Sequence, residues 1–399
     1  MSAVPLNRIK STYQFLSARV NNVSPSGIRK FFDLLSSVED VISLGVGEPD
    51  FVTPWQIREV AIYSLEKGYT MYTSNYGLPE LRQKLAEHLE SQYLGYNPNT
   101  ELLITTGVSE GLDLALRAIL NPGDEVIMPD PCYVAYPACT LLAEGKPVTV
   151  PTTEQNDFQI KASDIKTRIN HRTKAILIGY PSNPTGAIMP RDELAQIADI
   201  ADEYNLIVIS DEIYGRLVYD VDHVCFASLP RMRDRTILLS GFSKAYAMTG
   251  WRIGYAAANH QIIEAMTKIH QYTILCAPIT AQMAAIEALK SADNEVEAMV
   301  RDYDRRRRFM LEGLKDIGLT CFEPKGAFYT FPSIKVTGMT SEKFAERLLL
   351  EEKVAVVPGS AFGQCGEGYI RCCYATSLAD IEEALKRMGR FVSKYKQKT

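Results

Sequence analysis

Short apolar segments alternate with amphipathic segments between residues 100 and 260, and this alternation predicts a sheet layered with helices. Apolar runs predict strands at 101–106, 125–129, 147–150, 174–180, 206–210, 236–240 and 252–258. Amphipathic stretches predict helices at 110–120, 135–143 and 191–204. Continuous apolar strands that alternate with helices are typical of a mostly parallel sheet with both faces covered. We therefore predict an α/β fold, with a three-layer αβα domain around a mostly parallel, seven-stranded sheet.

The pattern changes after residue 290. A long charged stretch predicts a helix at 295–317, followed by short strands near 327–331, 354–357 and 369–373 and by helices at 341–352 and 378–393. These elements predict a smaller α+β domain. Residues 1–45 have no strand–helix rhythm of their own, and we expect them to pack with it. The predicted division is a large domain at 46–290 and a small domain made of 1–45 and 291–399.

Composition narrows the function classes. The chain has 399 residues, of which 46% are apolar, and a net charge of -5, which argues against nucleic-acid binding. It has no apolar stretch of membrane-spanning length and no apolar run near its start that resembles a secretory signal. The expected location is therefore cytoplasmic. Its eight cysteines form no CxxC pair or Cys/His cluster, so we expect buried thiols and no metal site.

Polar residues follow four of the predicted strands. They are Ser109, Glu110, Asn183, Asp211, Ser243 and Lys244. Ligands of open α/β sheets bind at the carboxyl ends of the strands, so these side chains should converge. Read singly, each has a structural alternative: a strand-end aspartate often caps a helix, an isolated lysine is usually solvated, and an asparagine beside a proline often makes a turn.

Taken together, the same residue types fit one kind of cofactor. A lysine amine can form a Schiff base with an aldehyde. A carboxylate can keep a pyridine nitrogen protonated, so that the ring accepts electrons. A helix N-terminus and an arginine can bind phosphate. A phosphorylated pyridine aldehyde has all three of these features.

The segment Gly241–Gly254, which reads GFSKAYAMTGWRIG, resembles the lysine-attachment motif of class I/II aminotransferases of fold type I. Further family motifs occur in the expected order at Gly47–Asp50, Tyr72–Gly77, Pro181–Gly186, Asp211–Tyr214, Pro358–Gly363 and Tyr369–Arg371. The resemblance covers nearly the whole chain. It implies pyridoxal 5′-phosphate as cofactor, ping-pong amino transfer and a homodimer with shared active sites.

The resemblance assigns the residues that contact the cofactor ring. Lys244 is similar to the Schiff-base lysine that also transfers the substrate proton, and Asp211 to the partner of the pyridine nitrogen. Asn183 and Tyr214 match the partners of the ring hydroxyl, and Tyr133 matches the aromatic residue that stacks on the ring. A cis peptide bond is implied before Pro184.

The remaining assignments concern phosphate and substrate. The implied phosphate site consists of Ser109, Glu110, Ser243 and Arg252. Arg371 matches the arginine that binds the substrate α-carboxylate, with Gly47 and Asn183 beside it. Tyr72 matches a tyrosine that reaches the phosphate of the neighbouring subunit.

The expected substrates are an aromatic, aspartate-type or alanine-type L-amino acid and a 2-oxo acid, with 2-oxoglutarate as the expected acceptor. Some aspartate-type relatives have a lysine two residues after the glycine that corresponds to Gly107, whereas this chain has Ser109. Strict aspartate specificity is therefore not implied. A run of four arginines, Arg305–Arg308, predicts a solvated or ion-paired helix face.

Three other functions are weighed against this one. A lyase or synthase on the same fold would keep the cofactor and change the reaction. A non-enzymatic sensor would need a basic DNA-binding module, which the sequence does not contain. A dinucleotide-binding protein is disfavoured because Gly45-Val-Gly47 lacks the third glycine of the GxGxxG motif.

Overall fold

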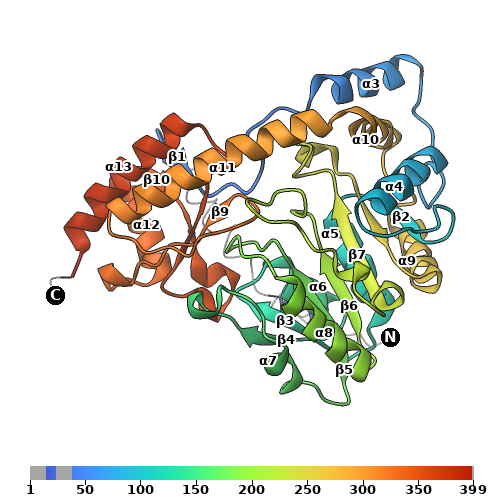
Figure 1. The fold of residues 1–399 in the computed structure, drawn as a ribbon, viewed down its shortest axis with the longest axis horizontal. Helices are drawn as coiled ribbons and strands as arrows, with labels where there is room; N and C mark the ends of the chain where they lie inside the picture. The colour runs from blue at the N-terminus through green and yellow to red at the C-terminus, as the bar shows by residue number, and fades with distance from the viewer. Residues whose placement is uncertain (1–14, 24–37, 398–399) are drawn as a thin grey trace, which may run out of the picture.

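A computed structural model describes residues 15–23 and 38–397 and contains the predicted seven-stranded sheet (Figure 1). The strands are β2 (Leu102–Thr105), β3 (Glu125–Asp130), β4 (Lys146–Pro151), β5 (Thr173–Gly179), β6 (Ile207–Asp211), β7 (Thr236–Gly241) and β8 (Gly254–Ala257). Their order is β2-β8-β7-β6-β5-β3-β4, and only β8 runs antiparallel to its neighbours. The predicted α/β class and strand number are confirmed.

The apolar runs form central strands because both faces of the sheet are buried. In β5, Ile176 and Ile178 belong to one hydrophobic core, whereas Ala175 and Leu177 belong to the core on the opposite face. Successive side chains of a strand point to opposite faces, so a strand buried on both sides must be apolar throughout.

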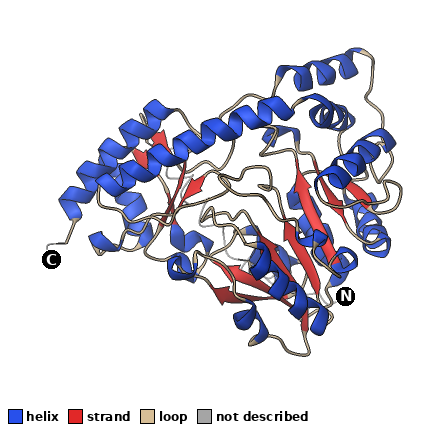
Figure 2. Cartoon of the chain, in the orientation of Figure 1, coloured by secondary structure: helices blue, strands red, loops and turns tan. Residues whose placement is uncertain are grey.

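Helices cover the two faces (Figure 2). The core on one face includes side chains of α5 (Val108–Ile119), α6 (Ala135–Leu142) and α9 (His260–Thr273). The core on the other face includes side chains of α7 (Ala162–Lys166) and α8 (Arg191–Glu203). Six strands point the same way, so their carboxyl ends share one edge, where the polar residues emerge.

The C-terminal part forms a second group of elements. It contains the long helix α11 (Asp293–Asp316), α12 (Ser341–Glu352) and α13 (Leu378–Tyr395). Its strands are β1 (Ile42–Ser43), which pairs with β10 (Val354–Ala355), and the sheet of β11 (Val357–Pro358), β12 (Ile370–Cys373) and β9 (Tyr329–Thr330). Residues 42 and 43 therefore pair with a strand of the C-terminal group. The domain boundaries at residues 46 and 290 stay a prediction.

Several helices were not anticipated from the sequence. They are α1 (Ala18–Asn21), α3 (Trp55–Glu66), α4 (Pro79–Gln92) and α10 (Ile279–Ser291), together with α7 and α9. The short helix α1 lies beside α6, and Arg19 pairs with Glu144 at 3.4 Å. Large apolar side chains lie on the exposed side of α3 as well as on its buried side. The sequence of this segment therefore lacks the clear separation of apolar and polar residues that predicts a helix.

Short 3₁₀ helices occupy connecting segments at Glu154–Asn156, Phe226–Ser228, Arg233–Arg235, Thr249–Trp251, Lys335–Thr337, Gly359–Phe362 and Gln364–Gly366. The peptide bond before Pro184 is cis, as the resemblance implied, and so are the bonds before Pro131 and Pro181. Within residues 15–23 and 38–397, no helix has the length and apolar character needed to cross a membrane.

Candidate active site

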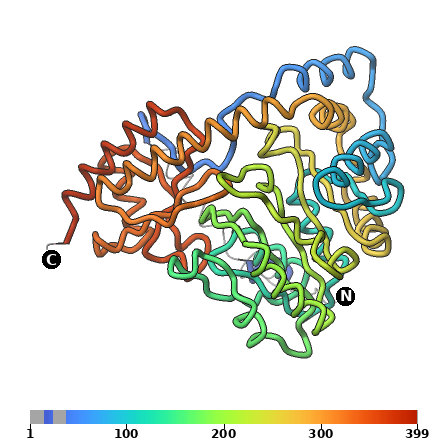
Figure 3. Tube along the Cα trace, viewed as in Figure 1, coloured from blue at the N-terminus to red at the C-terminus, as the bar shows by residue number. Residues whose placement is uncertain are grey.

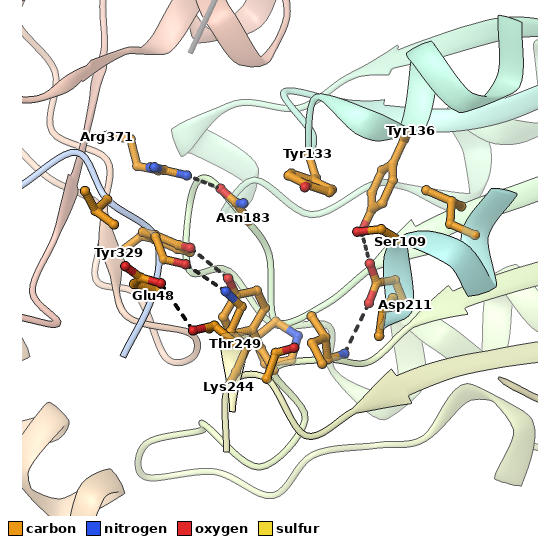
Figure 4. Close-up of a pocket in the computed structure, with 18 of the residues that line it drawn as sticks. Glu48, Ser109, Tyr133, Tyr136, Asn183, Asp211, Lys244, Thr249, Tyr329 and Arg371 are labelled. Carbon is orange, nitrogen blue, oxygen red and sulfur yellow. Dashed lines mark hydrogen bonds between the residues drawn. The ribbon is translucent and has the colours of Figure 1, made fainter. Parts of the chain in front are cut away.

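A cavity of about 420 Å³ lies between the carboxyl edge of the large sheet and the C-terminal group (Figure 4). Ten of the predicted site residues line it. They are Gly47, Ser109, Tyr133, Asn183, Asp211, Tyr214, Ser243, Lys244, Arg252 and Arg371. These residues come from widely separated segments, so the tertiary fold brings together what the sequence only lists in order.

Lys244 follows β7, in a turn that enters the cavity. Its Nζ donates a hydrogen bond to the carbonyl of Gly47 at 2.7 Å and lies 5.8 Å from the ring of Tyr214. Burial lowers the pKa of Lys244 to about 8, and the positive charge of Arg371 acts in the same direction. A lysine amine with a lowered pKa is more available as a nucleophile and as a base.

Asp211 is the last residue of β6 and is buried at the opposite end of the cavity from Arg371 (Figure 4). Tyr136 donates to its Oδ2 at 2.9 Å, and the backbone N–H of Ile213 donates to Oδ1 at 3.2 Å. Burial raises the pKa of Asp211 to about 6, while these two hydrogen bonds oppose the rise. Burial destabilises the charged form of this carboxylate, and a cationic group bound beside it would stabilise that form.

The Tyr136 contact depends on a glycine in the neighbouring strand. Gly179 pairs with Asp211 across the sheet, and a Cβ at Gly179 would lie 2.0 Å from the Tyr136 hydroxyl. No larger residue fits there without moving the tyrosine. Tyr136 was not predicted as a site residue, although its position in the expected helix after strand 125–129 was an available signal.

Beside Asp211 lies the N-terminus of α5, which starts after Gly107 in a positive-φ conformation (φ 78°). The first N–H groups of a helix have no partner within the helix, and they attract anions. Arg252 faces this terminus: a Cβ at Gly107 would lie 2.7 Å from its Nη2. Ser109, in the first turn of α5, and Ser243 also line the cavity, so hydroxyl groups, helix N–H groups and an arginine are available to bind an anion.

Two predicted residues lie away from the cavity. The carboxylate of Glu110 accepts a hydrogen bond from the backbone N–H of Thr106 and lies 2.6 Å from Nδ1 of the buried His270. It therefore points back into α5 and α9, and only its backbone N–H remains for the anion site. Tyr72 is 80% exposed and lies outside the cavity within this chain.

The opposite wall holds Arg371, on β12. Its Nη1 donates to Oδ1 of Asn183 at 2.9 Å and its Nη2 to the carbonyl of Gly45 at 2.7 Å. Its guanidinium lies 4.5 Å from the ring centre of Tyr329 and 4.9 Å from that of Phe362. Its Nε is buried without a hydrogen-bond partner in the described structure, so this N–H and the second N–H of each Nη take no part in these two hydrogen bonds.

Tyr329, on β9, was also not predicted. Its hydroxyl lies 2.7 Å from that of Tyr214, and a Cβ at Gly47 would lie 2.5 Å from the same oxygen. Burial raises the pKa of Tyr214 well above its usual value, so both hydroxyls stay protonated at neutral pH. The sequence offered little signal for Tyr329, because an aromatic residue in a short apolar strand usually belongs to the core.

The chain is similar to known proteins over nearly its whole length. Residues 39–388 match the family described as aminotransferase class I and II. The putative aminotransferase YugH of Bacillus subtilis is 55% identical, with 95% of this chain and 99% of that protein covered. An aspartate aminotransferase of Pyrococcus abyssi is 47% identical, with 96% and 99% covered. Aromatic-amino-acid aminotransferase 2 of Thermococcus litoralis is 44% identical, again with 96% and 99% covered.

Solved structures give the same result. The crystal structure of an aromatic aminotransferase from Pyrococcus horikoshii is 46% identical, with a TM-score of 0.88 and with 91% of this chain and 99% of that chain covered. The aspartate aminotransferase of Thermus thermophilus with maleate is 37% identical, with a TM-score of 0.90 and with 94% and 99% covered. The chain belongs to the class I and II aminotransferase family, and it is an aminotransferase of fold type I.

Proposed function

We propose that the chain uses pyridoxal 5′-phosphate to move an amino group from an L-amino acid to a 2-oxo acid. The observation that carries the proposal is that one cavity is lined by Lys244, with its pKa lowered to about 8, by the buried carboxylate of Asp211 and by an anion-binding helix terminus. When bound, the cofactor would supply an aldehyde for the lysine and a pyridine ring that accepts electrons.

The residues that line the cavity fit pyridoxal 5′-phosphate. Ser109, Ser243 and Arg252 would hold the phosphate together with the N-terminus of α5. Asp211 would face the pyridine nitrogen, and its raised pKa agrees with a carboxylate that binds a proton-bearing partner. Tyr133 would stack on the ring, because it lies across the cavity from Lys244 (Figure 4).

The chain's own groups perform the proton transfers. Lys244 would be the base that takes the α-proton of the amino acid and later gives a proton back, because its amine lines the cavity and has a lowered pKa. Asn183 and Tyr214 would donate to the ring hydroxyl. The carbonyl of Gly47, 2.7 Å from Nζ, restricts where the amine can point.

Arg371 would bind the substrate α-carboxylate. Its unpaired Nε and the edge of its guanidinium offer the two-donor geometry that a carboxylate requires. Asn183 and the backbone of Gly47 lie beside this position. In the described part of the chain, the only arginines that line the cavity are Arg252 and Arg371, so a second carboxylate of a substrate has no arginine of its own there.

The proposed donors are aromatic, aspartate-type or alanine-type amino acids, with 2-oxoglutarate as acceptor. Relatives named as aspartate aminotransferases and as aromatic aminotransferases support this range. Ser109 occupies the position at which some aspartate-type relatives have lysine. We therefore expect a broad donor range, without strict dependence on aspartate.

We also propose a cytoplasmic homodimer. Large apolar side chains are exposed on α3 and on the segment that follows it: Trp55, Ile62, Tyr63, Leu65, Met71 and Tyr72. Exposed apolar patches of this kind mark interaction surfaces. Tyr72 lies in this patch, which agrees with its proposed reach into a neighbouring active site.

Absorbance spectroscopy and a donor panel test the proposal. Purified protein supplied with pyridoxal 5′-phosphate should show the absorbance band of a bound cofactor imine. Borohydride reduction followed by peptide mapping should place the label on Lys244. Amino donors should then yield their keto acids with stoichiometric amination of 2-oxoglutarate. Label on another residue, or keto acid released without amination of the acceptor, would contradict the proposal.

A further inference from the structure

The run of four arginines at Arg305–Arg308 lies on α11, and its members have different surroundings. Successive helix residues are about 100° apart around the axis, so four in a row cannot all face solvent. The side chains of Arg305 and Arg308 are 67% and 58% exposed, whereas those of Arg306 and Arg307 are 8% and 0% exposed. The expectation of ion pairing was right, but two of the four side chains are buried.

The two buried arginines have different partners. Nη1 of Arg306 contacts both carboxylate oxygens of Asp50, at 2.9 and 2.8 Å, and Nη2 contacts Asp302 at 2.6 Å. Arg306 also lies 5.1 Å from the ring centre of Phe51. In contrast, Arg307 bonds to a separate set of groups, which are Asp304, Asp220, Glu323 and the carbonyl of Pro324. None of these lines the candidate active site.

Asp50 ends the Gly45–Asp50 loop, which follows β1 and runs from the C-terminal group toward α3 (Figure 3). This loop supplies two backbone carbonyls to the site. The carbonyl of Gly47 accepts from Lys244 Nζ at 2.7 Å, and that of Gly45 accepts from Arg371 Nη2 at 2.7 Å. The loop is therefore in contact with both the proposed base and the proposed carboxylate-binding residue.

The loop is irregular, and in its middle Oε2 of Glu48 accepts a hydrogen bond from Oγ1 of Thr249 at 3.2 Å. At its start, Leu44 is held by backbone hydrogen bonds to Ala355 and Cys373, at 2.8 and 2.7 Å. At its end, Arg306 binds Asp50. A loop without regular backbone hydrogen bonds takes its shape from contacts such as these, and the Arg306–Asp50 pair holds its last residue.

We propose that Arg306 is a positioning residue for the active site. Through Asp50 it fixes the Gly45–Asp50 loop, and so places the carbonyl of Gly47 against the Lys244 amine and that of Gly45 against Arg371. Arg306 touches neither the lysine nor the substrate position. The kinetic part of this inference depends on the proposed function, whereas the part that concerns the Lys244 amine does not.

Arg306→Lys and Arg307→Lys form a matched pair, because both change a buried arginine of the same helix and keep its charge. Both variants should unfold at lower temperature. Only Arg306→Lys should lower kcat/KM for the amino donor, by about 10-fold or more, because misplacement by about 1 Å at a reacting group is sufficient for such a loss.

A second measurement uses cofactor-free protein. Reductive methylation of Lys244 across pH, read by peptide mapping, reports the pH at which its amine becomes reactive. A carbonyl that accepts from an ammonium group stabilises the charged form, so loss of this contact should move the reactivity of Lys244 to lower pH. Arg306→Lys should show this shift and Arg307→Lys should not. This measurement remains valid even if the wild-type chain does not transaminate.

Asp50→Asn provides the second variant if Arg306→Lys does not fold, because it weakens the same ion pair from the loop side. Asp50→Asn should reproduce both the loss in kcat/KM and the shift to lower pH of the reactivity of Lys244. The inference is overturned if Arg306→Lys and Arg307→Lys change kcat/KM and Lys244 reactivity equally. It is also overturned if Arg306→Lys, or Asp50→Asn in its place, leaves kcat/KM within about twofold of the wild-type value and leaves the pH dependence of Lys244 reactivity unchanged.

Discussion

The two walls of the active-site cavity are built differently. On the sheet side, Asp211 is the last residue of the buried strand β6 and is paired in the ladder of the sheet, and Lys244 lies three residues after the end of β7. On the other side, Arg371 sits on a strand of four residues, and the Gly45–Asp50 loop has no regular structure. The comparison indicates that regular structure places the proposed cofactor groups, whereas specific polar contacts place the proposed substrate groups.

This difference has a physical basis. A carboxylate and an amine that must keep a fixed relation to one rigid ring benefit from the most rigid scaffold available. A wall that closes on variable substrates can be assembled from short strands and side-chain contacts. Arg371, for example, is held by Asn183 from the sheet side and by Gly45 from the loop, so it joins the two walls.

The largest effect is expected from Lys244→Ala. This change removes the proposed attachment point and base, so turnover should fall by about 10⁴-fold or more, and the absorbance band of the bound imine should disappear. Lys268→Ala is the control, because that side chain is 66% exposed and pairs only with Glu264. Full activity of Lys244→Ala would remove the proposed mechanism.

The second largest loss of activity is expected from Asp211→Asn. Asparagine keeps the shape but removes the charge that holds a pyridine nitrogen protonated, so kcat should fall by about 10² to 10³-fold while the protein stays folded. Asp130→Asn is a matched control: Asp130 also ends a buried strand but binds the N–H groups of Gln364 and Cys365 instead of facing the cavity. Equal kinetic losses in both variants would show that Asp211 has no special role.

Arg371→Lys tests the other wall. Lysine keeps the charge but loses the two-donor fork, so KM for the amino donor should rise by about 10 to 100-fold, with a smaller change in kcat. Arg390→Lys, an exposed arginine that pairs with Glu352, should leave KM unchanged. An unchanged KM in Arg371→Lys would reject its assignment to the α-carboxylate.

A smaller effect is expected in the stability of cofactor-free protein. The pKa of Lys244 is lowered from 10.5 to about 8, so between these values the unfolded chain binds more protons than the folded one. The unfolding free energy should therefore rise with pH in this window, relative to Lys244→Met, by up to about 3 kcal/mol. Urea unfolding at pH 7.5 and pH 10.5 measures the difference.

The control for this experiment is Lys268→Met, which should show the same pH dependence as wild type because the lysine is exposed. A constant difference between Lys244→Met and wild type at the two pH values would mean that the Lys244 amine has an ordinary pKa in the folded protein.

The sequence was most informative where residues are neighbours along the chain. The apolar runs predicted all seven strands of the large sheet, because burial on both faces leaves a continuous signal. The polar residues directly after those strands predicted Asp211 and Lys244. The motif resemblance added Arg371 and Arg252, which periodicity alone would have left as structural arginines.

The sequence was least informative where contacts join distant segments. Nothing in the local pattern indicated that Tyr136 reaches Asp211 across a gap left by Gly179, or that Tyr329 contacts Tyr214. The same holds for Glu110, whose side chain turns to His270, a residue 160 positions away. These contacts depend on side-chain direction and on the packing of whole elements, which no single segment encodes.

The sequence by itself determined the class of fold, the lysine and the carboxylate, because strand burial and short motifs are local properties. Only the tertiary structure decided which pKa values shift, which arginine of the run at Arg305–Arg308 binds Asp50, and which carbonyls hold Lys244 and Arg371. Burial and hydrogen bonding are set by groups that meet only after the chain has folded, so these properties belong to the assembled cavity.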